Sequence, residues 1–258
     1  MELIDTHCHL DVEEFDADRP AVLKRARRAG VVAQLIPAIH RAGWPGLLAL
    51  CRSEEGLYPA LGLHPVYIDR HEPADLDALE VTIAAERPLA IGEIGLDHAV
   101  EGLDQDRQQR FFEAQLAIAR SANLPVVLHV RRAHEDVLRL LRRARVRGGI
   151  AHAFNGSPDL AARYLDLGFK LGFGGMLTFE RSTRLRRLAR ELPIEAIVLE
   201  TDAPDLTVAS HRGERNSPEY LPECLAALAE VRGEDAAVLA ARTTANARDV
   251  LRIPVPTA

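Results

Sequence analysis

Short runs of apolar residues alternate along this chain with longer segments in which apolar residues recur every three or four positions. The short runs, rich in valine, isoleucine and leucine, are typical of buried strands, and the longer segments are typical of amphipathic helices. Eight strands are predicted, at 3–10, 31–39, 57–65, 88–97, 125–131, 148–154, 169–175 and 196–202. Helices are predicted at 18–29, 75–87, 104–122, 134–146, 158–167, 182–192, 219–232 and 235–251. This alternation of strand and helix indicates a parallel sheet.

The number and length of these repeats favour a barrel. Eight strand–helix repeats of about 25–30 residues add up to the usual size of a (β/α)8 fold, about 250 residues. We therefore expect an α/β protein, a single-domain (β/α)8 barrel of the TIM type spanning residues 1–258. An open, doubly wound sheet is the alternative. Because no flexible linker, charge block or low-complexity tract divides the chain, one domain is favoured.

Composition narrows the class of protein. Charged residues make up 27% of the chain, the formal net charge is -6, and the isoelectric point is near 5.9. These values exclude a basic protein that coats nucleic acid, so any attraction to nucleic acid must be local. Aromatic residues are only 5%, and Trp44 is the sole tryptophan, so no stacking platform for long single strands is evident.

Cysteine usage and the absence of targeting segments indicate the compartment. Cys8, Cys51 and Cys224 are far apart and odd in number, which indicates neither a disulfide framework nor a zinc ribbon. The segment MELIDTHCHL lacks the basic residues and long apolar run of a secretory signal. No later apolar run approaches the roughly 18 residues of a membrane span. We expect a cytoplasmic protein with no membrane association and no obligate protein partner.

Histidines and carboxylates gather at the C-terminal ends of the predicted strands. They are His7, His9, His64, Glu93, Asp97, His129, His152, Glu200 and Asp202. In a (β/α)8 barrel, active sites are built at this end. One buried histidine is usually a hydrogen-bonded core residue, whereas five or six on one rim indicate a shared site.

The segment His7-Cys8-His9 has the spacing of a metal-binding pair. Side chains alternate along a strand, so both imidazoles can face the barrel interior and bind one cation. Cys8 then points outward to the helical layer, where a thiol packs well, although a role as a ligand is the alternative. The same alternation places Asp5 inward beneath the histidines, either orienting one of them or filling a polar layer.

The remaining strand ends supply a second set of ligands. Glu93 lies in GEIGLD, where neighbouring glycines leave room for its carboxylate to bridge two metals, and His129 and His152 offer imidazole nitrogens. Asp202, just before Pro204, can bind a metal and accept a proton from water. The residues predicted to bind two divalent cations are His7, His9, Glu93, His129, His152 and Asp202. The predicted catalytic residues are Glu93 and Asp202.

This ligand set favours hydrolysis by a metal-activated water. Histidine-rich sites suit zinc, manganese, cobalt, nickel or iron better than magnesium, but they do not select among them. Two cations would lower the pKa of a bridging water and act as Lewis acids. No G-x-S-x-G elbow, P-loop or G-x-G-x-x-G follows a predicted strand, which disfavours acyl transfer, nucleoside triphosphate hydrolysis and dinucleotide redox chemistry.

An ordered series of segments resembles the TatD family of metal-dependent hydrolases, within the amidohydrolase superfamily. The segments are IDTHCHLD, GLHP, GEIGLD, LHVRRAHE, HAFNG, LETDAPDL and RNSPE, and the resemblance runs from residue 3 to about 250. It implies a (β/α)8 fold, two divalent metals and phosphodiester hydrolysis of DNA, in exonuclease or repair-type reactions. It carries the metal ligands onto the same six residues, with Asp202 as proton acceptor, and implies DNA ends as the nucleic acid substrate.

Two loops depart from the family pattern. After Asp97 this chain has His98 and the short segment AVEGLDQD, where many relatives have an aromatic residue and a longer loop. After His152 it has Asn155, where a serine is common. Both loops are expected to line the mouth of the site, so the departures concern the substrate more than the chemistry. The form TDAPDL resembles a less characterised branch of the family.

Four residues are expected to contact substrate: His64, Arg131, Asn155 and Glu200. Arg131 can bind a phosphate bidentately or form a structural ion pair. His64 can bind phosphate, act as a general acid or cap the barrel rim, and Glu200 can assist proton transfer or form an internal salt bridge. The segment 203–217, with His211, Arg212 and Arg215, is either a rim loop for an anionic ligand or a solvated loop.

Two other functions fit the same ligands. An activated water can attack a carbonyl carbon, so ester or amide hydrolysis of a small metabolite or an aminoacyl-tRNA is the second enzymatic hypothesis. A non-catalytic metal-binding module is the third.

Overall fold

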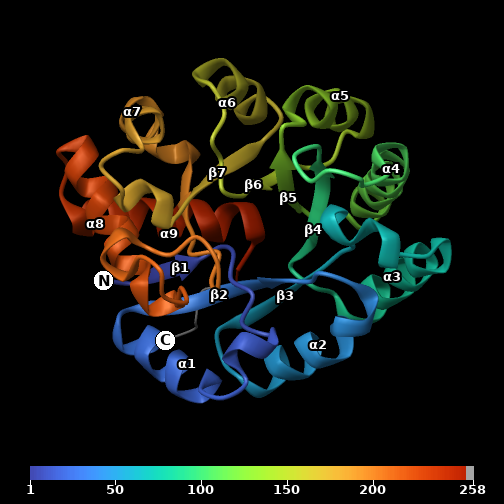
Figure 1. The fold of residues 1–258 in the computed structure, drawn as a ribbon, viewed down its shortest axis with the longest axis horizontal. Coiled ribbons are helices and arrows are strands. Elements are labelled where there is room, and N and C mark those ends of the chain that lie inside the picture. Colours follow the sequence, from blue (N-terminus) through green and yellow to red (C-terminus); the bar gives the residue numbers. More distant parts are fainter. Residues whose placement is uncertain (254–258) are drawn as a thin grey trace.

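The computed structural model describes residues 1–253 and contains a barrel of eight parallel strands (Figure 1). The strands are β1 (Leu3–Asp5), β2 (Val31–Pro37), β3 (Leu57–Leu61), β4 (Ala90–Asp97), β5 (Val126–Arg131), β6 (Gly149–Ala151), β7 (Phe169–Phe173) and β8 (Ile197–Leu199). Each strand pairs with the next one in the chain. The first and last segments also meet, because Thr6 N donates to Leu199 O at 3.0 Å and Asp202 N donates to His7 O at 2.8 Å. The predicted (β/α)8 fold is confirmed.

Helices surround the strands (Figure 1). The α-helices are α1 (Arg19–Arg28), α2 (Trp44–Ser53), α3 (Pro73–Glu86), α4 (Gln105–Ala122), α5 (His134–Ala144), α6 (Pro158–Leu165), α7 (Thr183–Glu191), α8 (Leu221–Arg232) and α9 (Ala236–Leu251). Short 3-10 helices lie at Glu13–Phe15, Arg41–Gly43, Pro65–Arg70, Gly175–Thr178, Ile194–Ala196, Ala209–His211 and Pro218–Tyr220. None of the helices within residues 1–253 is long and apolar enough to cross a membrane.

Helix α2 was not predicted from the sequence pattern. Pro45 and Gly46 stand in its first turn, and both residue types are poor helix formers in a helix interior. Proline is nevertheless tolerated at the start of a helix, where its missing N–H has no partner to lose. The helix buries Trp44, Leu47 and Leu48, so tertiary packing stabilises it despite its composition.

The last helix covers the N-terminal end of the barrel. An apolar cluster joins residues of the strands to the end of α9; its members are Ile4, Ala33, Leu35, Ala60, Ala90, Val127, Ile150, Val198, Ala247, Val250, Leu251 and Ile253. Asn246 Nδ2 donates to the carbonyls of Ile194 and Ile197, at the start of β8, at 2.7 and 2.8 Å. With this end packed, the C-terminal strand ends remain available for a site.

Several strands are shorter than predicted. The predicted strands 148–154 and 196–202 end at Ala151 and Leu199 in the structure. Beyond these points the backbone leaves extended geometry, because Ala153 and Asp202 have positive φ angles of 44° and 59°. The polar residues at these strand ends therefore lie on short loops, whose backbone is free to turn the side chains toward a common centre.

Candidate metal centre

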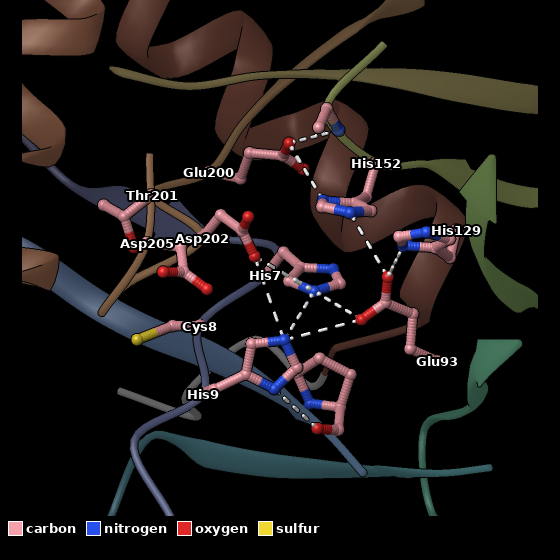
Figure 2. A network of polar contacts seen from close by, with 12 residues as sticks. His7, Cys8, His9, Glu93, His129, His152, Glu200, Thr201, Asp202 and Asp205 are labelled. Carbon is pink, nitrogen blue, oxygen red and sulfur yellow. Dashed lines mark hydrogen bonds and ion pairs between the residues drawn. The ribbon is translucent and has the colours of Figure 1, made fainter. Parts of the chain in front are cut away.

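A buried carboxylate lies between two groups of histidines at the C-terminal end of the barrel (Figure 2). Glu93, on β4, is only 1% exposed. Its Oε2 lies 3.1 Å from His7 Nε2 and 3.4 Å from His9 Nε2. Its Oε1 lies 2.9 Å from His129 Nδ1 and 3.2 Å from His152 Nε2. Each oxygen of one carboxylate thus faces its own set of imidazole nitrogens.

The first group contains His7, His9 and Asp202. The two Nε2 atoms lie 3.2 Å apart, and Asp202 Oδ1 lies 3.5 Å from His7 Nε2 and 3.8 Å from His9 Nε2. His9 Nδ1 faces the Pro37 carbonyl at 3.1 Å, which can only accept, so Nδ1 carries a proton. The lone pair of neutral His9 is therefore on Nε2 and points into the group.

Cys8 lies outside this group, as expected. Its side chain is fully buried in the apolar core, with Sγ 3.8 Å from the Ala203 carbonyl, and it points away from the imidazoles (Figure 2). Burial raises the pKa of this thiol well above its usual value. Cys8 is therefore a packing residue in this arrangement.

Asp5 ties the first strand to the segment after the last one. Its Oδ1 accepts from the amides of His7 at 3.2 Å and Thr201 at 3.0 Å, and its Oδ2 accepts from Thr201 Oγ1 at 2.6 Å. No hydrogen bond joins Asp5 to an imidazole within residues 1–253. Of the two roles expected for Asp5, the structure supports the polar layer and not the orientation of a histidine ring.

His64 borders the second group, and a backbone contact fixes its tautomer. Its Nε2 lies 3.3 Å from Glu93 Oε1. Its Nδ1 accepts from the Val66 amide at 3.1 Å, so neutral His64 carries its proton on Nε2. Although its position would permit metal binding, this tautomer offers the centre a hydrogen-bond donor instead of a lone pair.

Glu200 lies behind His152 and is 1% exposed. Its Oε1 accepts from the Ala153 amide at 2.5 Å and lies 3.5 Å from His152 Nδ1. Its Oε2 has no hydrogen-bond partner among the described residues. Gly172 makes this position possible, because a β-carbon there would overlap the Glu200 carboxylate. Glu200 therefore supports His152 and still has one oxygen for a further partner.

Glycine is also required in the segment GEIGLD, but for a different reason from the one expected from the sequence. Gly95 has a φ of +150°, and a β-carbon there would overlap the His129 carbonyl oxygen. The close approach of β4 to β5, and not room around the carboxylate, is what excludes a side chain at this position.

The protonation equilibria indicate a centre that favours added positive charge. Burial alone would raise the pKa of Glu93, but the neighbouring imidazoles hold it well below its usual range. Burial alone would lower the pKa of His9, but Glu93 and Asp202 raise it to about 9. Burial raises the pKa of Asp202 to about 6. The carboxylates therefore favour a proton on His9, whereas burial holds the pKa of His7 well below its usual value. A bound cation would supply positive charge to the centre in place of that proton.

The residues fit divalent cations in geometry as well as charge. Tetrahedral ligands about 2.0–2.1 Å from zinc lie roughly 3.3 Å apart. His7 Nε2 and His9 Nε2 lie 3.2 Å apart, and each lies 3.1–3.8 Å from Glu93 Oε2 and from Asp202 Oδ1. Such close contacts between lone pairs are unfavourable unless a proton or a cation lies among them.

A cavity of about 1310 Å³ opens over the centre. Glu93, His129, His152 and Asp202 lie on its wall beside a larger set of loop residues, which includes Tyr67, Arg131, Phe154, Asn155, Met176, Arg181, Arg184, Glu200 and Leu206. Arg131 also lies 3.3 Å from Asp97 Oδ2. The expected structural ion pair of Arg131 is therefore present, and its 54% exposed side chain still reaches the cavity.

One of the two loops expected at the mouth of the site does not line the cavity, and most of the segment 203–217, for which a solvated loop was the alternative, also lies away from it. The segment that follows Asp97 (98–104) contributes no described residue to the cavity wall, although Asn155 does. Of the segment 203–217, only Pro204, Asp205 and Leu206 line the cavity. Arg215 instead pairs with both carboxylate oxygens of Asp18, at 2.8 and 2.9 Å, and lies over the Phe15 ring.

The barrel and its centre of histidines and carboxylates define a metal-dependent hydrolase. The family model described as TatD related DNase matches residues 4–252, and the chain belongs to this family. The resemblance drawn from the sequence is thus confirmed, as is the metal-dependent hydrolase reading.

Relatives cover nearly the whole chain. A protein of Escherichia coli K12 named uncharacterized metal-dependent hydrolase YjjV is 38% identical over 255 residues, 97% of this chain and 98% of the relative. A protein of Klebsiella pneumoniae named 3'-5' ssDNA/RNA exonuclease TatD is 34% identical over 260 residues, 98% and 99% of the two chains. The crystal structure of the E. coli protein YjjV superposes with a TM-score of 0.94 at 37% identity, covering 98% of each chain.

Proposed function

We propose that this chain is a metal-dependent phosphodiesterase that shortens nucleic acid strands from their ends. The position of Glu93 carries the proposal, because its two oxygens face two separate sets of nitrogen ligands. That arrangement suits a carboxylate that bridges two cations. The relative named as an exonuclease supports the choice of substrate.

The proposed ligands divide into two sets that share Glu93. One set is His7, His9 and Asp202, and the other is His129 and His152. Divalent cations held there would lower the pKa of a water and polarise the scissile phosphate. The excess of nitrogen ligands favours zinc, manganese, cobalt, nickel or iron over magnesium.

Asp202 is the proposed proton acceptor. Its side chain is 15% exposed, on the cavity side of the centre. Its pKa of about 6, raised by burial, suits a base that must be ionised at neutral pH and still hold a proton briefly. Glu200, two residues before Asp202 and with one oxygen unpartnered among residues 1–253, is the proposed group that passes the proton on.

His64 is the proposed donor to the substrate. The Val66 amide fixes the proton of neutral His64 on Nε2, which points at the centre. An N–H there can bind a phosphate oxygen or supply a proton to the leaving oxygen. A donor role requires a hydrogen on His64 Nε2, whereas binding a metal through Nε2 would require a lone pair on that atom.

The cavity wall suits a nucleotide. Arg131, Arg181 and Arg184 line it, and guanidinium groups bind phosphates bidentately. Met176 and Leu206 also line it and are 37% and 40% exposed, which provides apolar surface for a base or sugar. Asn155 is placed to bind a base edge or sugar.

The test is cleavage by protein stripped with a chelator and reloaded with each divalent ion in turn. Single-stranded DNA, RNA and duplex DNA, labelled at either end, should be shortened from one end only when metal is restored. Arg184→Gln should raise KM for DNA about tenfold, whereas Arg143→Gln, on the exposed face of α5, should not. Metal-loaded protein that cleaves no nucleic acid under any ion, while hydrolysing carboxylic esters or amides, would replace this substrate with the second hypothesis.

A further inference from the structure

Asp97 is a fully buried carboxylate next to the centre, with no role in the proposed function. It ends β4, in the segment GEIGLD. Its Oδ1 accepts from the backbone amides of Ala99 at 2.8 Å and Val100 at 3.0 Å. Its Oδ2 lies 2.8 Å from His129 Nε2 and 3.3 Å from Arg131 Nη1. Four donors therefore surround this carboxylate, and each oxygen has its own pair.

A carboxylate oxygen faces each ring nitrogen of His129, and a cation bound to Glu93 would leave Asp97 as the acceptor for the ring proton. Asp97 Oδ2, held as an acceptor, requires a hydrogen on His129 Nε2. The opposite ring nitrogen, Nδ1, faces Glu93 Oε1 at 2.9 Å. With Nε2 as the N–H, neutral His129 has its lone pair on Nδ1, pointing into the centre.

We propose that Asp97 is a positioning residue that keeps the proton of His129 on Nε2 and thereby presents Nδ1 to a metal ion. The inference rests on the proposed ligation by His129. Carboxylates that accept from the outer nitrogen of a metal-binding histidine orient the ring and increase its basicity.

The segment 98–104 has a role in this arrangement. Ala99 and Val100 belong to the short stretch AVEGLDQD that departs from the family pattern, and their amides point back at Asp97 Oδ1. From the other side, Gln108 Oε1 accepts from the Asp97 amide at 3.0 Å. The short loop therefore fixes the carboxylate behind the centre and does not form part of the cavity wall.

The substitution Asp97→Asn should reverse the tautomer. An asparagine would place its oxygen at the Oδ1 position, where two backbone N–H groups need an acceptor. Its NH2 group would then occupy the Oδ2 position and donate to His129 Nε2. The imidazole proton would move to Nδ1, which removes the lone pair from the metal position while changing almost no volume.

The experiment combines zinc binding with nitrogen NMR of histidine-labelled protein. Zinc-loaded wild-type protein should show His129, assigned with His129→Gln, protonated on Nε2. Asp97→Asn should bind one zinc per chain about 10–100-fold more weakly in chelator competition and should show the reversed tautomer in the zinc-free state. Asp104→Asn, the same change at the exposed N-cap of α4, and Arg131→Gln, which removes only the other partner of Oδ2, should keep both wild-type readouts.

The outcomes separate this inference from the proposed function. A wild-type His129 that lacks a proton on Nε2, or an Asp97→Asn protein that binds two zinc ions as tightly as wild type, would overturn the role of Asp97. If the Asp97→Asn protein does not fold, the tautomer of His129 in the wild-type protein decides by itself whether Asp97 has this role. Since neither readout uses a substrate, a protein with the expected tautomer and no nuclease activity would refute the function and leave this inference standing.

Discussion

Asp5 joins the first strand to the segment after the last one, and we predict that removing its carboxylate lowers the free energy of unfolding. Asp5→Ala removes the acceptor of two backbone amides, those of His7 and Thr201, and of the Thr201 hydroxyl. All three residues are at most 1% exposed, so water does not replace the lost acceptor. The hydroxyl can rotate toward another acceptor, but the two amides are fixed by the chain.

The expected magnitude follows from those two amides. A buried backbone donor left without a partner costs about 1–3 kcal/mol, so Asp5→Ala should lower the free energy of unfolding by roughly 2–6 kcal/mol. Asp5→Asn is the matched control, because the amide oxygen can accept from both backbone N–H groups and the NH2 can donate to Thr201 Oγ1. Its cost should stay below about 1.5 kcal/mol.

Urea unfolding followed by circular dichroism measures both values, with chelator present so that metal binding does not contribute. Equal losses for Asp5→Ala and Asp5→Asn, or an Asp5→Ala protein within about 1 kcal/mol of wild type, would refute the account of two orphaned amides.

The same pair of proteins makes a prediction about pH. Burial raises the pKa of Asp5 from 3.8 to about 7, so between these values the folded chain holds a proton that the unfolded chain has lost. The contribution of Asp5 is therefore fully present at low pH and declines as the pH rises through the folded pKa. The stability of wild type relative to Asp5→Asn should fall from about pH 5 to about pH 7; a rise would contradict the sign.

Three further predictions concern the centre. Gly172→Ala should displace the Glu200 carboxylate and reduce kcat/KM at least about tenfold, with the fold retained by circular dichroism. Gly46→Ala, where a β-carbon would meet no neighbouring atom, should keep the wild-type kcat/KM. Equal activities of the two variants would contradict this role of Gly172. Metal affinity should rise from about pH 6 to about pH 9, because a cation must displace the proton that His9 retains up to its raised pKa of about 9. An affinity independent of pH in metal titrations would count against His9 as a ligand. A divalent ion at a hundred times its Kd should raise the free energy of unfolding by about 2.7 kcal/mol in urea titrations, and Glu93→Gln should reduce this gain.

The periodic parts of the fold were predictable from the sequence. Buried parallel strands read as unbroken apolar runs, so all eight were located, and the strand-end rule brought six scattered histidines and carboxylates together. The spacing argument for His7 and His9 reached the right geometry, although β1 ends at Asp5 and the two imidazoles come from the loop beyond it.

What the sequence left open depends on pairings between distant residues. The segment with Arg215 was left open between a rim loop and a solvated loop, because the partner of Arg215, Asp18, is 197 positions away and no local sequence pattern indicates that bond. The tautomers of His64 and His129 depend on single contacts to Val66 and Asp97, which a periodicity argument does not contain. Residue types indicated the centre; individual hydrogen bonds decide which side chains give a lone pair and which give a proton.

The joining of the first and last strands also has a consequence for how the chain is synthesised. Asp202 N bonds to His7 O, and the side chains of both residues belong to the same ligand group. A ribosome delivers His7 first and Asp202 near the end, so a growing chain has an incomplete ligand set until about four-fifths of it has been made. With Asp202 as a proposed ligand, we expect metal-dependent hydrolysis to arise only when the barrel closes, and truncated chains that lack the last strand should be inactive.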